Sequence, residues 1–481
     1  MYLLVAYLVW DVRIDGAGED ACYSMTLSPS GNPVIAGNYG VALYAAELAA
    51  ADGSFLWQYI FAFPGDGRSN VKRILLDPSD STFVMGGTVY PYSGDDLPCG
   101  FVAKMDSAAT VWMYVDSADG CGRREGFSGV TIGDDGHYYA YGTDYETYSA
   151  DWLTPSRRFV LKLERSTGSK LWRYEPGGYS YTDAAPSPGG GAVVVGFGAD
   201  GEVQRVDATG SEVWSITPSD AKLWGVAISS GGHPVVVGSK DGDFYVAQLQ
   251  METGGTRWSF SRNGSANATD VAFAVATDPS GGAYVAGYVD NGLNGRDALV
   301  VRLDSVGAVM WEFSYNGPFN SDDVFTDLLL TPDGRLMAVG YSINAGTGRD
   351  MLLVSLNPET GDTLWVLTYD SPYSLDDEAT AVAVRGSSVF ICGNSYKLPT
   401  DRDIVLLRYE DLTAVEEMSE DAPLEVIVAG REVRVISEGK VEIYDAAGRK
   451  FTEGLGPMRV VLRRGVWFVK VGRKVRKILL R

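Results

Sequence analysis

The chain has 481 residues, among them 58 glycines, 27 tyrosines and 11 tryptophans. This length exceeds one ordinary hydrophobic core, which leaves either several domains or one large repeat architecture. The richness in glycine and tyrosine is typical of turns and strands, so it favours an all-β fold over long helices.

Charge is divided unevenly along the chain. Residues 1–423 contain 26 Lys and Arg against 56 Asp and Glu, a net of −30, whereas residues 424–481 contain 14 against 6, a net of +8. The acidic body repels phosphate backbones, so we expect no nucleic acid as its partner. No run of 18 apolar residues occurs, and we therefore expect no membrane span.

The N-terminal run, residues 1–10 (MYLLVAYLVW), is apolar but lacks the basic start and small-residue cleavage site of a signal peptide. It continues directly into strand-like sequence, and we interpret it as a strand. Residues 6–15 (AYLVWDVRID) match the fourth strand of the repeat described next, although no blade of their own accompanies them.

A repeat unit of four strand-length apolar runs occupies most of the chain. Residues 270–315 align in register with residues 323–369, and each unit has the size of a four-stranded propeller blade. We expect one glycine near the end of each second strand, at Gly37, Gly86, Gly142, Gly196, Gly238, Gly287, Gly340 and Gly393. We expect one tryptophan to open each fourth strand, at Trp57, Trp112, Trp172, Trp214, Trp258, Trp311, Trp365 and Trp10.

The last repeat, residues 377–409, has three strands and no tryptophan. The N-terminal strand supplies what it lacks, so that no sheet edge is left unpaired. Residues 1–409 are therefore predicted to form an eight-bladed β-propeller that is closed by its own N-terminal strand.

Four cysteines show no metal-ligand spacing. Cys99 and Cys121 both lie in loop-like sequence of one repeat, which predicts a disulfide in an oxidising compartment. Cys22 and Cys392 lie in apolar strands, and we interpret them as buried thiols, although ring closure would bring their blades side by side.

The turns before the tryptophans read LERSTGSKLW, VDATGSEVW, LQMETGGTRW, LDSVGAVMW and LNPETGDTLW. They resemble the tryptophan-docking motif of quinoprotein-like (PQQ-repeat) propellers, and the unit also resembles the bacterial SBBP repeat, over about residues 5–410. The resemblance implies the fold, with each indole N–H bonded to backbone. The chain has no adjacent Cys-Cys pair and no CxxCH haem motif, so no cofactor is predicted.

An acidic linker, residues 410–423 (EDLTAVEEMSEDAP), separates the propeller from residues 424–481, where short strands predict a small β-sandwich. The strings VEIYDAAGRK and GVWFVKVG resemble the type IX secretion (Por-type) C-terminal sorting domain, with Asp445, Gly448, Arg449, Gly465, Val466 and Trp467 at its recognisable positions. That resemblance implies export to the cell surface or beyond and recognition by the secretion machinery. The alternative is a sandwich that packs on the propeller or on a neighbouring subunit, as in a homo-oligomer or a head-to-tail assembly.

An acidic residue opens most of the innermost strands, at Asp20, Glu125, Asp183, Asp220, Asp270, Asp323 and Asp377. Ring closure would bring these carboxylates around one channel mouth, where a hard cation such as Ca²⁺ would bind, with Asp20, Asp220, Asp270, Asp323 and Asp377 as the candidates. The alternative role is that of a turn or inter-blade hydrogen-bond acceptor.

The sequence favours a non-catalytic, exported propeller that serves as a binding, adhesive or structural protein, with an extracellular protein or glycan as ligand. Four long loops, residues 87–101, 143–157, 288–297 and 341–350, should share one rim. Their aromatic residues Tyr90, Tyr92, Tyr145, Tyr148 and Trp152 are candidate anchors, unless they only pack the loops. The alternative is an extracellular quinoprotein-like oxidoreductase or hydrolase on the same rim, although the two histidines, His137 and His233, lie in turn sequences.

Overall fold

The computed structural model describes most of the chain. The described residues are 6–16, 18–63, 69–90, 98–107, 109–116, 124–145, 155–178, 180–331, 333–398, 401–411, 425–429, 432–436, 440–445, 450–455, 458–461, 465–471 and 474–480.

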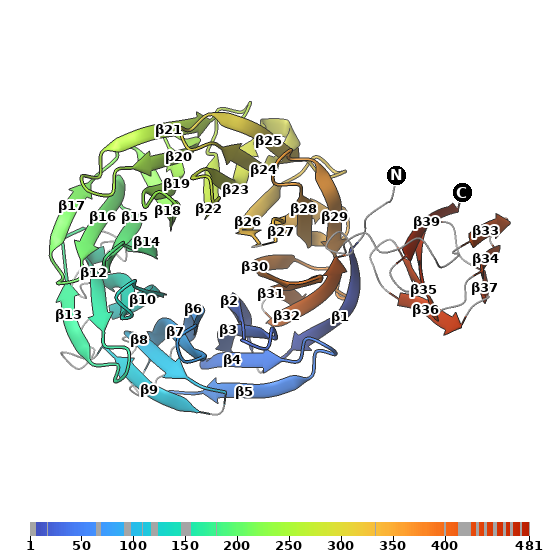
Figure 1. The fold of residues 1–481 in the computed structure, drawn as a ribbon, viewed down its shortest axis with the longest axis horizontal. Coiled ribbons are helices and arrows are strands. Elements are labelled where there is room, and N and C mark those ends of the chain that lie inside the picture. The colour runs from blue at the N-terminus through green and yellow to red at the C-terminus, as the bar shows by residue number, and fades with distance from the viewer. Residues whose placement is uncertain are drawn as a thin grey trace.

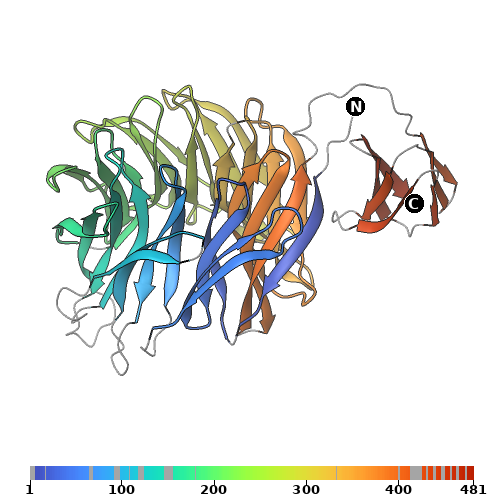
Figure 2. The same cartoon turned by 60° about the horizontal axis from the view of Figure 1, so that its bottom comes forward.

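Eight four-stranded antiparallel sheets form a ring around a central channel, which confirms the predicted eight-bladed propeller (Figure 1). Figure 2 shows the strands running between the two faces of the ring. From the channel outwards, blades 1 to 4 consist of β2 (Ala21–Leu27), β3 (Pro33–Tyr39), β4 (Ala42–Leu48) and β5 (Phe55–Phe61); β6 (Asn70–Asp77), β7 (Thr82–Val89), β8 (Cys99–Met105) and β9 (Thr110–Val115); β10 (Arg124–Ile132), β11 (Tyr138–Tyr145), β12 (Pro155–Leu163) and β13 (Lys170–Tyr174); and β14 (Ser180–Pro186), β15 (Gly191–Phe197), β16 (Gly201–Asp207) and β17 (Glu212–Ile216).

The second half of the ring repeats this order. Blades 5 to 8 consist of β18 (Ala221–Ile228), β19 (Pro234–Lys240), β20 (Asp243–Leu249) and β21 (Thr256–Arg262); β22 (Val271–Thr277), β23 (Ala283–Asp290), β24 (Arg296–Leu303) and β25 (Val309–Tyr315), with the short 3₁₀ helix η1 (Gly292–Asn294) before β24; β26 (Asp323–Leu330), β27 (Leu336–Asn344), β28 (Gly348–Leu356) and β29 (Thr363–Tyr369); and β30 (Asp377–Arg385), β31 (Ser388–Leu398), β32 (Asp401–Asp411) and β1 (Ala6–Ile14).

The N-terminal strand closes the ring. β1 pairs antiparallel with β32 along its whole length, from Ala6 opposite Asp411 to Ile14 opposite Ile404, and it is the outermost strand of blade 8. The ring is therefore fastened by strands from opposite ends of the propeller, as its missing eighth tryptophan strand predicted.

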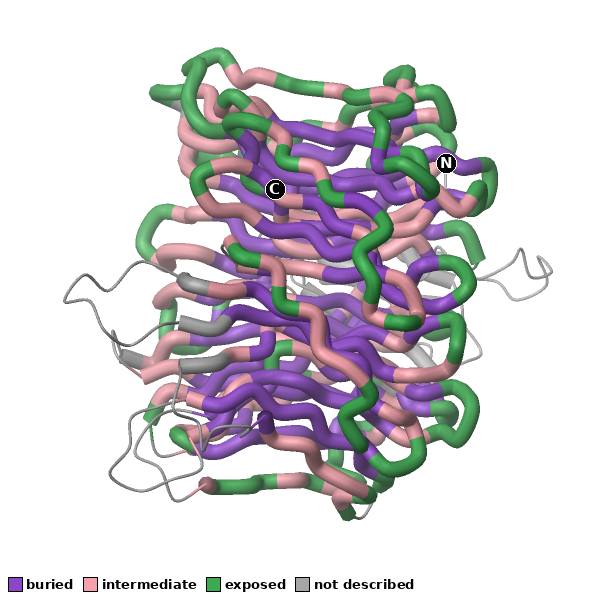
Figure 3. The backbone as a smooth tube through the Cα atoms, turned by 90° about the vertical axis from the view of Figure 1, so that its left-hand side faces the viewer, coloured by how far each residue is buried: buried purple, intermediate pink, exposed green. Residues whose placement is uncertain are grey.

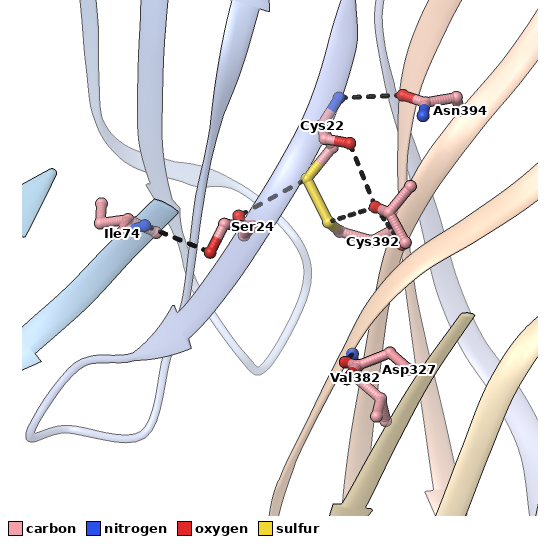
Figure 4. The surroundings of a disulfide bond; sticks show 8 residues. Cys22, Ser24, Ile74, Asp327, Val382, Cys392 and Asn394 are labelled. Atoms are coloured by element: carbon pink, nitrogen blue, oxygen red, sulfur yellow. Dashed lines mark hydrogen bonds between the residues drawn. A yellow bond between two sulfur atoms is a disulfide. The ribbon is translucent and has the colours of Figure 1, made fainter. Parts of the chain in front are cut away.

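A disulfide between Cys22 and Cys392 crosses the same closure (Figure 4). Cys22 lies on the innermost strand of blade 1 and Cys392 on the second strand of blade 8, with 6.4 Å between their Cα atoms and 370 residues between them in sequence. The interpretation of these two residues as buried thiols is thus wrong. Both side chains are buried, but ring closure places them face to face, within reach of a covalent bond.

Tryptophans join neighbouring blades, as predicted. Six of the eight indole N–H groups donate to a backbone carbonyl in the next blade, as Trp172 does to Ala208 at 3.0 Å and Trp311 to Pro358 at 3.0 Å. The turn glycine of that next blade lies against the ring. Gly307 has φ of +85°, and a Cβ there would be 2.7 Å from Trp258, which explains why the turn requires glycine.

Two tryptophans depart from this pattern. Trp57 donates to Glu47 within its own blade, and Trp365 donates to the carboxylate of Asp411. In blade 2 the turn that would receive Trp57 lies in DSAAT, which has no glycine. The docking therefore changes where the turn sequence changes.

The second-strand glycine lies opposite a β-bulge in the innermost strand of every blade. A side chain there would collide with first-strand backbone, as at Gly37 against Ala21 and at Gly340 against Val324. In blade 2 this position is Gly87, not the predicted Gly86, because Gly87 faces Val71 across the pair. Adjacent glycines had concealed the register.

Buried segments run through the middle of each blade and exposed turns form the two rims, as the tube coloured by burial shows (Figure 3). Residues 425–480 contain two antiparallel sheets. One consists of β33 (Glu425–Ala429), β34 (Glu432–Ile436) and β37 (Met458–Val461), and the other of β36 (Lys450–Leu455), β35 (Lys440–Asp445), β38 (Gly465–Val471) and β39 (Lys474–Leu480). No helix within the described ranges is long and apolar enough to cross a membrane.

Candidate functional site

One rim of the propeller collects the connections between second and third strands and those between consecutive blades. All four long loops singled out from the sequence join a second to a third strand, so they share this rim, which we call the loop rim. It exposes apolar side chains at Leu293 in η1, at Phe319 between blades 6 and 7, and at Tyr373 between blades 7 and 8.

The predicted aromatic anchors lie largely outside what the structure describes. Tyr90 follows β7, is half-buried, and its backbone N–H donates to Ser69 at 3.3 Å. Tyr145 ends β11, but its side chain is not among the described ones, and Tyr92, Tyr148 and Trp152 lie outside the described residues. Their role as anchors stays a prediction.

The same holds for the predicted Cys99–Cys121 bond. Cys99 is buried at the start of β8 and is disulfide-bonded, whereas Cys121 lies outside the described residues.

Four of the five predicted cation ligands tie the loop rim together by accepting backbone hydrogen bonds. Each buried carboxylate accepts an N–H from a residue four to six positions before it: Asp20 from Gly16, Asp270 from Gly264 at 2.7 Å, Asp323 from Gly317 at 2.6 Å and Asp377 from Ser371 at 2.6 Å. Asp20 and Asp270 also accept from the residue 20 positions later, Gly40 at 2.6 Å and Asp290 at 2.5 Å. These carboxylates brace the seams between blades, which is the alternative role stated from the sequence.

Asp220 does not share this arrangement. It is exposed, has φ of +53°, and its own N–H donates to Asp200 at 2.9 Å. Asp183 differs too, because it lies within β14 and not at its opening, and the side chain of Glu125 is outside the described set. The seven acidic residues therefore do not form one uniform ring.

A second set of acidic residues, missed in the sequence, completes the seams. These residues stand two positions before the partner of the second-strand glycine, at Asp243, Asp297, Asp350 and Asp403 on the third strands of blades 5 to 8. Three of them occur in the repeated strings GRDALVVRL, GRDMLLVSL and DRDIVLLRY, so the recurrence was visible in the repeat.

Two seams bring three carboxylates together. Between blades 7 and 8, Asp350, Asp370 and Asp377 each offer an oxygen within 4.8 Å of the other two, and between blades 8 and 1, Asp403, Asp15 and Asp20 do the same. Burial raises the pKa of both Asp377 and Asp403 to about 6. At the 8/1 seam, Lys397 forms an ion pair of 2.9 Å with Asp15.

The channel contains an ion pair that spans three blades. Arg73 of β6 reaches Asp183 of β14 at 2.6 Å and the hydroxyl of Tyr141 at 3.3 Å. It passes Gly129, the blade 3 residue at the equivalent position after the bulge, where a side chain would collide with Tyr141. Asp183 in turn accepts the N–H of Val226 in blade 5 at 3.0 Å.

Asp327 lines the same layer of the channel from blade 7. It accepts the N–H of Leu328 at 2.9 Å and that of Val382 in blade 8 at 3.2 Å. Burial raises the pKa of Asp327 to about 6, although those N–H groups and the charge of Arg73 lower it. These channel side chains hold blades together.

Both histidines lie on the rim opposite the long loops, in turns between first and second strands. His137 lines a cavity of about 450 Å³ with Lys104 and Arg165, which are paired with Asp80 at 2.6 Å and with Asp77. Burial, followed by the nearby charge of Arg257, lowers the pKa of His233. Neither imidazole faces the loop rim.

Comparisons with known proteins place the chain in a family. None of the curated proteins matches its sequence. Among solved structures, the ring resembles Chaetomium thermophilum Sqt1, solved bound to the N-terminus of ribosomal protein L10, with 12% identity, a TM-score of 0.55, and coverage of 83% of this chain and 98% of that chain. The Dos1 propeller gives 11%, 0.52, 84% and 95%, and a europium-containing methanol dehydrogenase gives 12%, 0.50, 84% and 93%.

At such identities these likenesses show the fold alone. Two overlapping matches to one family, at residues 156–342 and 199–449, together cover more than half of the sequence. The chain therefore belongs to the PQQ-like repeat family that is described as outer membrane protein assembly factor BamB.

Proposed function

We propose that this protein is exported and acts without catalysis, as a binding or structural propeller whose contact face is the loop rim. The observation that carries the proposal is the Cys22–Cys392 disulfide, because such bonds persist in oxidising compartments and are rare in reducing ones. The disulfide-bonded state of Cys99 supports the same location, the cell surface or the extracellular space.

The loop rim fits a binding role better than a catalytic one. Its innermost carboxylates are engaged by backbone N–H groups at the seams, and the channel below it is crossed by the Arg73–Asp183 ion pair. Meanwhile Leu293 and Phe319 project from its loops as exposed apolar side chains, which favours contact with a protein or glycan surface. The residues that would serve a general acid or base at neutral pH, His137 and His233, lie on the other rim.

The basic residues 424–481 are proposed to act in export or in assembly. As a sorting module, they would be recognised by the secretion machinery. As a retained module, their net charge of +8 would steer them onto the acidic propeller of a second copy, whose residues 1–423 carry −30. Intact mass of the protein recovered from its native source separates these roles, because cleavage removes the module and assembly requires it.

Cell fractionation with surface cross-linking tests the proposal. We expect the wild-type chain outside the cytoplasm, and we expect a defined cross-linked partner that is lost in the loop-rim variant Leu293→Ser/Phe319→Ser. The control Val306→Ser changes an equally exposed apolar residue on the opposite rim and should keep the partner. A cytoplasmic chain, or a partner kept by the loop-rim variant, contradicts the proposal. An absorption spectrum that reveals a bound quinone would instead favour the oxidoreductase alternative.

A further inference from the structure

Three carboxylates from three different elements meet at the seam between blades 7 and 8. Asp350 comes from β28 of blade 7, Asp370 from the connection after β29, and Asp377 from the first position of β30 in blade 8. Each offers an oxygen within 4.8 Å of the other two. Asp377 is completely buried and Asp350 is 5% exposed, while Asp370 is exposed and connects the cluster to solvent.

The two buried carboxylates are only half satisfied. One oxygen of Asp377 accepts the N–H of Ser371 at 2.6 Å, and one oxygen of Asp350 accepts the side-chain amide of Asn344 at 2.9 Å. The second oxygen, Oδ1, of each residue is buried without a hydrogen-bond partner. Buried charges normally find a partner, because an uncompensated carboxylate in a protein interior costs several kcal/mol. The geometry therefore leaves a place for a positive charge.

Further oxygens surround this place. The hydroxyls of Ser371 and Thr347 lie close enough to lower the pKa of Asp377 and Asp350 respectively, yet neither hydroxyl has a well-formed hydrogen bond. The nearest guanidinium, that of Arg13, donates to the hydroxyls of Tyr369 at 3.3 Å and Ser395 at 3.5 Å. Among the described residues, no lysine or arginine forms an ion pair with Asp350 or Asp377.

The neighbouring seams show what is missing. The 8/1 cluster, built from equivalent positions, has the ammonium of Lys397 at 2.9 Å from Asp15. At the 6/7 seam the position of Asp370 is taken by Asn316, so that only Asp297 and Asp323 are acidic. The 7/8 seam thus has the full charge of one neighbour without its lysine.

We infer that the seam between blades 7 and 8 binds one divalent cation, Ca²⁺, through Asp350, Asp370 and Asp377, with hydroxyl oxygens and water completing the shell. Two oxygens on the same Ca²⁺, at about 2.3–2.6 Å, lie no more than about 5 Å apart, which fits the cluster. Oxygen-only ligands and six or more positions suit Ca²⁺ rather than a transition metal. Because the ligands come from both blades, the ion fastens blade 7 to blade 8.

Calcium titration of the full-length chain tests this inference. The protein is stripped with EDTA, and Ca²⁺ binding is measured by calorimetry, with stoichiometry from native mass spectrometry and melting temperature as a second readout. We expect one ion per chain and a higher melting temperature with Ca²⁺ than with EDTA, since a ligand that binds only the folded state stabilises it. The variants Asp350→Asn and Asp370→Asn should each weaken this binding at least tenfold.

The matched control is Asp15→Asn, which removes the equivalent carboxylate from the cluster that Lys397 neutralises, and it should bind Ca²⁺ like the wild type. Asp370 is exposed, so Asp370→Asn should melt like the wild type in EDTA and reproduces the composition of the 6/7 seam. Absence of Ca²⁺ binding, binding unchanged in both variants, or equal loss in Asp15→Asn would overturn the inference.

Discussion

The seam between blades 4 and 5 and the seam between blades 8 and 1 contain the same hydrogen bond over very different sequence separations. Thr182 donates to the carbonyl of Leu223 at 2.8 Å, 41 residues away, and Thr380 donates to that of Cys22 at 3.1 Å, 358 residues away. Only the second seam adds a disulfide. The entropy lost on closing a loop grows with its length, so the strongest fasteners lie where the chain ends must meet.

Deletion of residues 1–14 should have the largest effect on this difference. It removes β1, exposes the edge of β32 and leaves blade 8 with three strands. We expect aggregation or loss of cooperative melting, measured by calorimetry and light scattering. A control that lacks only residues 1–5 keeps all of β1. Unchanged melting of the longer deletion would mean that the ring closes without its N-terminal strand.

Removal of the disulfide comes next. Cys22→Ala/Cys392→Ala should lower the free energy of unfolding by about 2–5 kcal/mol, because it lengthens the free loop of the unfolded chain and removes buried sulfur atoms. Guanidinium denaturation measures the change. A midpoint equal to that of the wild type would show that β1 alone fastens the ring.

Gly307→Ala probes an interior seam. The new Cβ would meet Trp258 at 2.7 Å in a backbone with φ of +85°. We expect a loss of about 2–3 kcal/mol, of which the positive φ contributes about 1–2 kcal/mol. Gly334→Ala is the matched control, because Gly334 has φ of +79° and open space around it. If both variants lose equal stability, the contact between turn and tryptophan contributes nothing.

The channel carboxylate should have the smallest effect. Asp327 has its pKa raised to about 6 by burial, so the folded state binds its proton more tightly than the unfolded state, and stability falls as pH rises from about 4 to above 6. Asp327→Asn lacks this loss. We expect it to match the wild type near pH 4 and to exceed it by about 1 kcal/mol above pH 7, after allowance for water in the channel.

Melting curves of both chains between pH 4 and 8 measure this difference. A constant difference between the two curves would contradict the titration.

The ring and its closure could be predicted because their signals are periodic. Trp10 has the spacing of a fourth strand without a blade, and that irregularity identified β1 as the closing strand. The Cys22–Cys392 bond gave no such signal, since the two residues meet only after closure. The difference between Gly86 and Gly87 is a matter of register, which two adjacent glycines cannot reveal.

The candidate site was predictable only in part. Asp377 was identified because it opens a strand, but Asp350 was missed, although its RD string recurs in three blades. The Arg73–Asp183 pair depends on a single arginine that reaches past Gly129, and no repeat announces it. Repetition reveals the scaffold, whereas the departures from it set the chemistry of the seams and the channel.

The central claim, an exported ring locked by a disulfide, is tested most directly by thiol labelling of protein purified from its native source. The chain is denatured with a maleimide in the absence of reductant, and its peptides are weighed. We predict that Cys22 and Cys392 stay unlabelled and are recovered as one linked peptide pair, and that both are labelled after reduction. Labelling of both residues before reduction would show that the ring closes without the bond and would remove the main support for export.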